Sequence, residues 1–94
     1  MSHLPSPQTL HQVTSPEDLG LHVRSVRKSL ELRIDDTASF SEVSVDLMSR
    51  LENGRSGVRL DKLLKVLDGL GLTLLVATKE EAERLVRAQG RSAQ

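Results

Sequence analysis

The side chains that could perform catalysis or bind a metal are scattered along this sequence. Serine, histidine and aspartate residues are present, but none lies in a glycine-rich nucleophile elbow or a phosphate-binding loop. His3 and His11 share the N-terminal stretch, with no third metal ligand near them in the sequence. The sequence therefore predicts no catalytic residue, no metal site and no cofactor.

Composition and charge limit the classes of partner. The chain has 94 residues, with 13 basic and 13 acidic side chains and no cysteine. This balance excludes a strongly basic nucleic-acid binder, so any binding to phosphate must depend on the local placement of arginine and lysine. The lack of cysteine excludes disulfides and thiolate metal sites. Without a long apolar run or the layout of a signal peptide, we expect a cytoplasmic protein that makes no membrane contact.

The element that could best position polar side chains begins at Ser44, where the sequence predicts a short helix. Ser44 can accept a hydrogen bond from an amide of the first turn, as an N-cap residue does. Asn53 and Gly54 tolerate the left-handed conformation that ends many helices. Met48 and Leu51 lie three positions apart on one face, so we expect both side chains to face the core.

Three blocks of sequence occur in a characteristic order. The first is Leu19-Gly20 with Val23-Arg24 and Arg27-Lys28, the second is Val43-Ser44 with Met48 to Gly54, and the third is Leu60 to Leu72. Together they resemble the first helix, the second half of the motif and the fourth helix of the Xre/lambda-repressor-like helix-turn-helix family. The likeness covers residues 19–77. It implies that the predicted helix at Ser44 is the recognition helix, which in this family lies in the DNA major groove.

Two longer helices are predicted on either side of this segment. Ser15-Pro16-Glu17-Asp18 has the pattern of a capping box with proline at the first helical position. An apolar stripe at helical spacing follows it: Leu19, Val23, Val26 and Leu30. A second stripe over residues 60–70 predicts a helix that closes the core and ends at Gly71.

Residues 32–42 differ most from the family. The family usually has a phosphate-contacting polar residue where this chain has Ile34, a core leucine where it has Thr37, and a turn glycine where it has Glu42. Acidic side chains also lie near the presumed DNA face: Asp35, Asp36, Glu42 and Asp46. These departures support an alternative, in which the protein is an interaction module that keeps the fold and has lost strong DNA binding.

The resemblance implies a set of candidate DNA-binding residues on the recognition helix and beside it. These are Arg24, Lys28, Arg33, Ser44, Val45, Asp46, Leu47, Ser49, Arg50, Arg55 and Arg59. Arg50 either contacts DNA or supports the fold by pairing with an acid. Leu47 either meets a thymine methyl group or packs on the second helix around Phe40. Glu52 is expected to pair with Arg27, because a carboxylate pointed at DNA would repel phosphate.

Residues 72–77, Leu-Thr-Leu-Leu-Val-Ala, have apolar side chains on both faces of a period-two pattern, which favours a short β-strand. A lone strand cannot satisfy its backbone hydrogen bonds, and the chain offers no second strand. We therefore expect a homodimer in which this strand pairs with its own copy in antiparallel orientation. The dimerisation residues would be Leu72, Leu74, Leu75 and Val76.

The expected fold is all-α. It comprises a lambda-repressor-like helix-turn-helix bundle, a short C-terminal strand that pairs across a dimer, and a final short helix capped at Thr78. The expected parts are a flexible N-terminal segment (1–14), the DNA-binding domain (15–71), the dimerisation strand with the C-terminal helix (72–89) and a disordered tail (90–94).

In its small size and in the apolar strand expected directly after the helix-turn-helix, the protein resembles the HipB-type antitoxins. This resemblance implies a dimeric repressor that reads a palindromic operator in double-stranded DNA. It also implies a toxin-antitoxin operon, with a HipA-type kinase toxin as partner. A stand-alone phage-type or metabolic repressor is the alternative within the same class.

Overall fold

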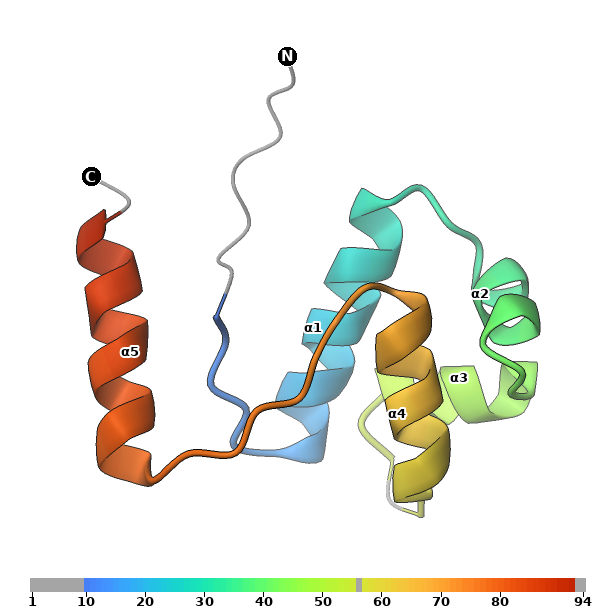
Figure 1. The fold of residues 1–94 in the computed structure, drawn as a ribbon. Helices are drawn as coiled ribbons and strands as arrows, with labels where there is room; N and C mark the ends of the chain where they lie inside the picture. The colour runs from blue at the N-terminus through green and yellow to red at the C-terminus, as the bar shows by residue number, and fades with distance from the viewer. Residues whose placement is uncertain (1–9, 56, 93–94) are drawn as a thin grey trace. The chain divides into compact units, whose positions relative to one another are not determined.

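A computed structural model describes residues 10–55 and 57–92, and these residues form five α-helices and no β-strand (Figure 1). The helices are α1 (Pro16–Ser29), α2 (Ile34–Phe40), α3 (Val45–Glu52), α4 (Leu60–Gly69) and α5 (Lys79–Ser92). None of the described helices is long and apolar enough to cross a membrane. The all-α expectation is confirmed. Residues 1–9 of the expected flexible segment and residues 93–94 of the expected tail lie outside the described residues.

The chain divides into two compact units, and one of them, Val13–Leu74, contains α1 to α4. Its core is built from Val23, Ala38, Met48, Leu51, Val66, Leu67 and Leu70. Within this unit α3 packs against both α1 and α2, and α2 also packs against α4. Met48 is 0% exposed and Leu51 is 5% exposed, so the expected inward face of α3 is confirmed.

Hydrogen bonds confirm three of the expected helix starts. The side chains of Ser15, Ser44 and Thr78 each accept a bond from the amide three residues later, at 3.0, 3.0 and 3.1 Å. Each bond satisfies an amide that the start of a helix leaves without a partner. The short α3 therefore has a well-defined first turn.

All four helices of the bundle end at a residue with a left-handed backbone. These residues are Glu31, Glu42, Gly54 and Gly71, with φ angles of 58°, 61°, 69° and 76°. At each end, the amide of this residue and the next amide bond back to carbonyl groups of the last helical turn. Glycine adopts this conformation without steric cost, whereas a residue with a Cβ atom is strained. The chain thus reverses sharply after each helix, with strain at Glu31 and Glu42.

The backbones of α1 and α3 touch at Gly20. A Cβ atom at this position would lie 2.4 Å from the carbonyl oxygen of Leu51 and 2.8 Å from that of Glu52. Only glycine allows such an approach, because the atoms it meets belong to the backbone and cannot rotate away. Gly20 therefore sets the distance between α1 and the last turn of α3.

Two residues of α2 that depart from the family pattern lie in or beside the core. Thr37 is 0% exposed, and its hydroxyl donates to the carbonyl of Arg33 at 3.0 Å, so the buried polar group is satisfied. Ile34 is half-buried and packs against the core. By contrast, Leu30 of the predicted apolar stripe is 51% exposed, because it is the cap residue after α1.

The C-terminal part differs from expectation in three ways. Residues 72–78 form neither helix nor strand in the described chain, so the dimer strand stays a prediction. α5 continues to Ser92, beyond the expected end at residue 89. In the second unit, whose described residues are 10–12 and 75–92, the Gln89 side chain donates to the carbonyl of Leu10 at 2.8 Å. Part of the segment expected to be flexible is therefore held against α5.

Candidate nucleic-acid interface

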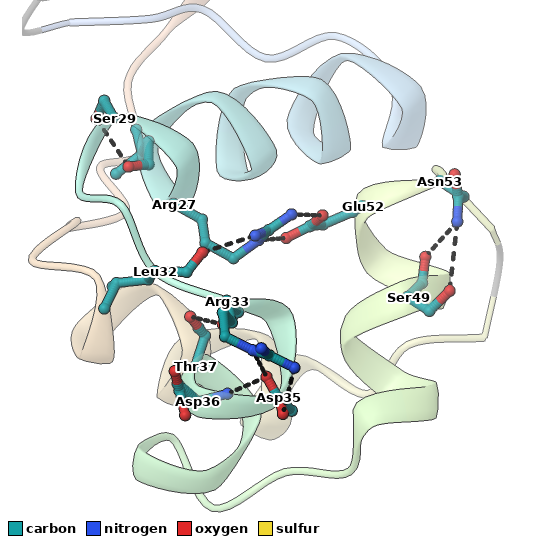
Figure 2. A network of polar contacts seen from close by, with 11 residues as sticks. Arg27, Ser29, Leu32, Arg33, Asp35, Asp36, Thr37, Ser49, Glu52 and Asn53 are labelled. Atoms are coloured by element: carbon teal, nitrogen blue, oxygen red, sulfur yellow. Dashed lines mark hydrogen bonds and ion pairs between the residues drawn. The ribbon is translucent and has the colours of Figure 1, made fainter.

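A buried ion pair fixes the end of α3 on α1. The Arg27 guanidinium donates from Nε to Glu52 Oε2 at 2.6 Å and from Nη2 to Oε1 at 2.9 Å (Figure 2). Its Nη1 donates to the carbonyl of Leu32 at 2.8 Å. Arg27 is 9% exposed and Glu52 6%, and their hydrogen bond raises the pKa of the guanidinium. The expected structural role of Glu52 is confirmed, and the pair also ties the turn after α1 to α3.

With Met48, Leu51 and Glu52 turned inward, α3 presents its remaining side chains outward. Val45 is 47% exposed, Asp46 is exposed, and Ser49 and Arg50 are half-buried. The outward face thus combines one apolar side chain with hydroxyl, carboxylate and guanidinium groups. Such a mixture can make hydrogen bonds and methyl contacts with base edges in a groove.

Leu47 is less exposed than a contact with a thymine methyl group would require. Its side chain is half-buried and packs against the core. This position agrees with the alternative in which Leu47 supports the bundle. Val45, on the first turn of α3, is the more accessible apolar residue and therefore the better candidate for contact with a thymine methyl group.

Arg50 supports the loop that follows α3. Its guanidinium lies 3.7 Å from the Asp46 carboxylate, and Nη2 donates to the carbonyl of Gly57 at 3.0 Å. Gly57 has a φ of 85°, a conformation that favours glycine. Of the two roles expected for Arg50, the structure therefore shows the pairing with an acid. The same hydrogen bond holds the loop that carries Arg55 and leads to Arg59.

The six candidate cations fall into two groups. Three pair with carboxylates: Arg33 with Asp35 at 3.0 Å, Arg50 with Asp46 at 3.7 Å and Arg59 with Asp61 at 3.2 Å. The hydrogen bond between Arg33 and Asp35 lowers the pKa of that carboxyl group and raises the pKa of the guanidinium. The side chains of Arg24, Lys28 and Arg55 make no hydrogen bond or ion pair within the described ranges. These three are ready to contact an external anion.

Two surface depressions share Ser49 and Asn53, at the C-terminal end of α3. One is lined by Asp46, Ser49, Arg50, Asn53 and Arg55. The other is lined by Arg24, Arg27, Arg33, Ile34, Ser49, Glu52 and Asn53. The structure thus brings Arg24 and Arg33 together in one depression, and Arg50 and Arg55 in the other. Ser44, Val45, Leu47, Lys28 and Arg59 line neither depression.

Sequence reasoning assigned Asn53 only to the end of the helix. The structure shows that its side-chain amide also donates to the carbonyl of Ser49 at 2.8 Å, on the surface between the two depressions (Figure 2). A spacing of four residues places Ser49 and Asn53 on one helix face, so helical periodicity could have found this pair.

The expected dimerisation residues differ in exposure. Leu72 is half-buried and packs against the core of its own unit. Leu74, Leu75 and Val76 are 47%, 69% and 94% exposed. Three consecutive exposed apolar residues are a feature that a partner surface would explain.

Comparison with known proteins identifies the family. Residues 18–85 match the helix-turn-helix domain family. The chain is 32% identical over 73 residues to the uncharacterized HTH-type transcriptional regulator y4mF of Sinorhizobium fredii, covering 78% of this chain and 96% of that protein.

Solved structures have the same fold. A HipB-O4 20mer complex matches with a TM-score of 0.69 at 20% identity, covering 74% of this chain and 99% of that chain. The HipA-HipB-O2-O3 complex gives the same values. The clp gene regulator ClgR from C. glutamicum matches with a TM-score of 0.59 at 25% identity, covering 89% of this chain and 97% of that chain. The chain therefore belongs to the helix-turn-helix family of transcriptional regulators, and its fold is that of a DNA-binding regulator.

Proposed function

We propose that the protein is a dimeric transcriptional repressor that reads a palindromic DNA operator. The observation that carries this proposal is the setting of α3. This helix contributes Ser49 to two adjoining depressions, of which one also contains Arg24 and Arg33 and the other Arg50 and Arg55. A helix in the major groove has a phosphate backbone on each side, so cations in two depressions along the helix suit this placement.

The residues of α3 divide into proposed base contacts and proposed supports. Val45, Asp46 and Ser49 lie on its first turns, which in helix-turn-helix proteins enter the groove. Ser44 precedes them, and its hydroxyl is already used to cap the helix. Leu47 contributes mainly by packing, since it is half-buried.

Phosphate contacts would come from the candidate cations around α3. Arg24, Lys28 and Arg55 need no rearrangement, whereas Arg33, Arg50 and Arg59 share their charge with a carboxylate. Binding should therefore weaken steeply with salt, by about 0.9 in the log–log slope for each neutralised phosphate.

Dimerisation would use the strand proposed over residues 72–77. The exposed side chains of Leu74, Leu75 and Val76 support it. A fixed two-fold axis would set two copies of α3 about 34–36 Å apart, the spacing of one DNA turn. Light scattering on the full chain should report a dimer at micromolar concentration, and Leu74→Pro should shift it to monomer.

The antitoxin role extends this proposal. The fold likeness to HipB, seen in a complex with HipA, supports a HipA-type kinase as second partner of this chain. The identity of 20% leaves this partner as a matter for experiment. Co-purification of the protein with a kinase encoded next to it would test this partner. The Leu74→Pro variant, which we expect to be a monomer, would show whether kinase binding requires dimerisation.

A second candidate function has one observation in its favour. Half of the candidate cations are paired with carboxylates, which reduces the positive potential that DNA would meet. The protein would then be an interaction module that has kept the fold and lost strong DNA binding.

One binding experiment decides between the two functions. Gel mobility of the full chain should be measured with DNA from its own promoter and with a shuffled duplex of the same length, at about 50 and 200 mM salt, a range over which phosphate contacts weaken strongly. We expect the full chain to bind the promoter DNA more tightly than the shuffled duplex. Arg55→Ala should weaken both duplexes and flatten the salt slope, whereas Lys65→Ala, an exposed cation paired with Glu42, should change little. Equal, weak binding to both duplexes would favour the interaction module.

A further inference from the structure

Two helices of the bundle begin with the same three-residue pattern. Arg33-Ile34-Asp35 opens α2, and Arg59-Leu60-Asp61 opens α4. In both, the arginine is the N-cap residue and its side chain makes no capping hydrogen bond. In both, the aspartate follows in the first turn, where the helix dipole favours a negative charge.

The two aspartates are held by similar contacts, with two bonds from the arginine at Asp35 and one at Asp61. Asp35 accepts from Arg33 Nε at 3.0 Å and from Nη2 at 3.4 Å, and its Oδ1 also accepts from the Asp36 amide at 3.0 Å (Figure 2). Asp61 accepts from Arg59 Nη2 at 3.2 Å, and its Oδ1 accepts from the Lys62 amide at 3.0 Å. Each carboxylate is thus fixed from two sides, by a guanidinium group and by a backbone amide.

This arrangement occupies the guanidinium groups that a phosphate would need. The Nε and Nη edge of arginine binds a carboxylate and a phosphate with the same paired geometry. Arg33 lines the depression that it shares with Arg24, Ser49 and Asn53, beside the proposed reading helix. A DNA phosphate that approaches Arg33 there meets an edge already filled by Asp35.

We infer that Asp35 is an internal competitor for phosphate at Arg33, and that Asp61 plays the same part at Arg59. The inference rests on the proposed DNA-binding function and adds its regulation: DNA gains these two cations only by displacing a carboxylate. Both pairs are exposed, and exposed ion pairs are weak, so the exchange tunes affinity without preventing binding. The protein thereby binds DNA more weakly than its count of arginines implies.

The test compares two neighbouring carboxylates in the full chain. Asp35→Asn removes the competitor, and Asp36→Asn removes an equal charge one position away. Asp36 is also exposed, and its carboxylate makes no hydrogen bond or ion pair with any residue that the structure describes. The hydrogen bond from Arg33 to Asp35 raises the pKa of Arg33 most, and the more distant charge of Asp36 adds less. We expect Asp35→Asn to bind promoter DNA at least about threefold more tightly than Asp36→Asn, as for release of one exposed ion pair. Its salt slope should be steeper by roughly 0.9, since one more phosphate is neutralised.

Further variants separate this inference from general charge effects. The gain of Asp35→Asn should vanish in an Arg33→Ala background. If Asp35→Asn alters the fold, as circular dichroism would reveal, Asp61→Asn tests the same idea on α4, with Asp68→Asn at the other end of that helix as a control for the loss of one charge. Equal gains within a pair, or a gain that persists without Arg33, would overturn the inference and leave DNA binding intact. If neither the unmodified chain nor Asp35→Asn bound any duplex at low salt, both this inference and the proposed DNA-binding function would be overturned.

Discussion

α2 and α3 are neighbouring helices of seven and eight residues, and they differ in how the local sequence supports them. α3 begins at Ser44, whose hydroxyl caps it, and is followed by Gly54 in a left-handed conformation. α2 begins at Arg33 without a side-chain cap and is followed by Glu42, which is strained in that conformation. The helix proposed to enter the groove therefore has the better local signals.

α3 and α2 also differ in their tertiary contacts. α3 contributes Met48 and Leu51 to the core, and its Glu52 joins the buried pair with Arg27. α2 contributes the smaller side chains Thr37 and Ala38. A small and partly polar core face gains less free energy from burial, so α2 is held by weaker packing than α3. The proposed reading helix is thus anchored more strongly than the helix that lies beside it.

The largest expected effect comes from breaking the anchor of α3. Glu52→Ala leaves the buried Arg27 guanidinium without its counter-charge, which should cost about 3–5 kcal/mol of stability. Thermal or urea unfolding followed by circular dichroism measures the loss. Asp61→Ala, which removes an exposed pair, is the control and should change Tm little. Similar losses in the two variants would show that the buried pair does not anchor α3.

Gly20→Ala should be nearly as severe, at about 3 kcal/mol. The new Cβ atom would meet the backbone of α3, so α1 and α3 must separate. We expect lower Tm and weaker binding to promoter DNA, because α3 would shift. Gly71→Ala is the matched control: apart from its chain neighbours, no described atom lies within 4 Å of its new Cβ, and only the strain of its φ of 76° remains, worth about 1–2 kcal/mol. If Gly20→Ala were the milder change, the close contact would not control the position of α3.

Ser44→Ala should cost about 1 kcal/mol, because an amide of the first turn of α3 loses its partner. Arg33→Ala at the equivalent position of α2 removes no capping bond and should leave the unfolding midpoint almost unchanged. Comparing the urea midpoints of both variants tests whether the two helix starts differ as the hydrogen bonds indicate. Equal destabilisation would contradict that difference.

The smallest expected effect is a gain in stability. Glu42→Gly relieves the left-handed strain after α2 and should stabilise the bundle by about 0.5–1 kcal/mol, after the entropic cost of glycine is subtracted. Glu42→Ala loses the same ion pair with Lys65 but keeps the strain, so it serves as control. A Tm for Glu42→Gly at or below that of Glu42→Ala would mean that the strain is absent.

Much of the bundle could be predicted because its signals are local. Ser15, Ser44 and Gly71 mark helix ends through hydrogen-bond chemistry that depends on a few neighbouring residues. The pairing of Arg27 with Glu52 is a long-range contact, and it followed from the family resemblance together with the argument that an acid should avoid DNA.

Other features depend on packing that no single segment encodes. Leu47 is half-buried because it packs against the assembled core, and helical periodicity alone left its role open. Arg33 and Arg59 were expected as cations, but their pairing with aspartates depends on side-chain directions at two helix starts. The proposed strand needs a second copy, so one chain cannot display it.

The contact between Gly20 and α3 has a further consequence for the lifetime of the protein. Eight residues are too few to form a stable isolated helix in water, so α3 exists only while it is docked on α1. Its core-facing amides should then exchange hydrogen with solvent only when the whole bundle opens. A protease can cleave within α3 only in molecules that have unfolded, and the survival of the reading surface in the cell is tied to the global stability of the fold.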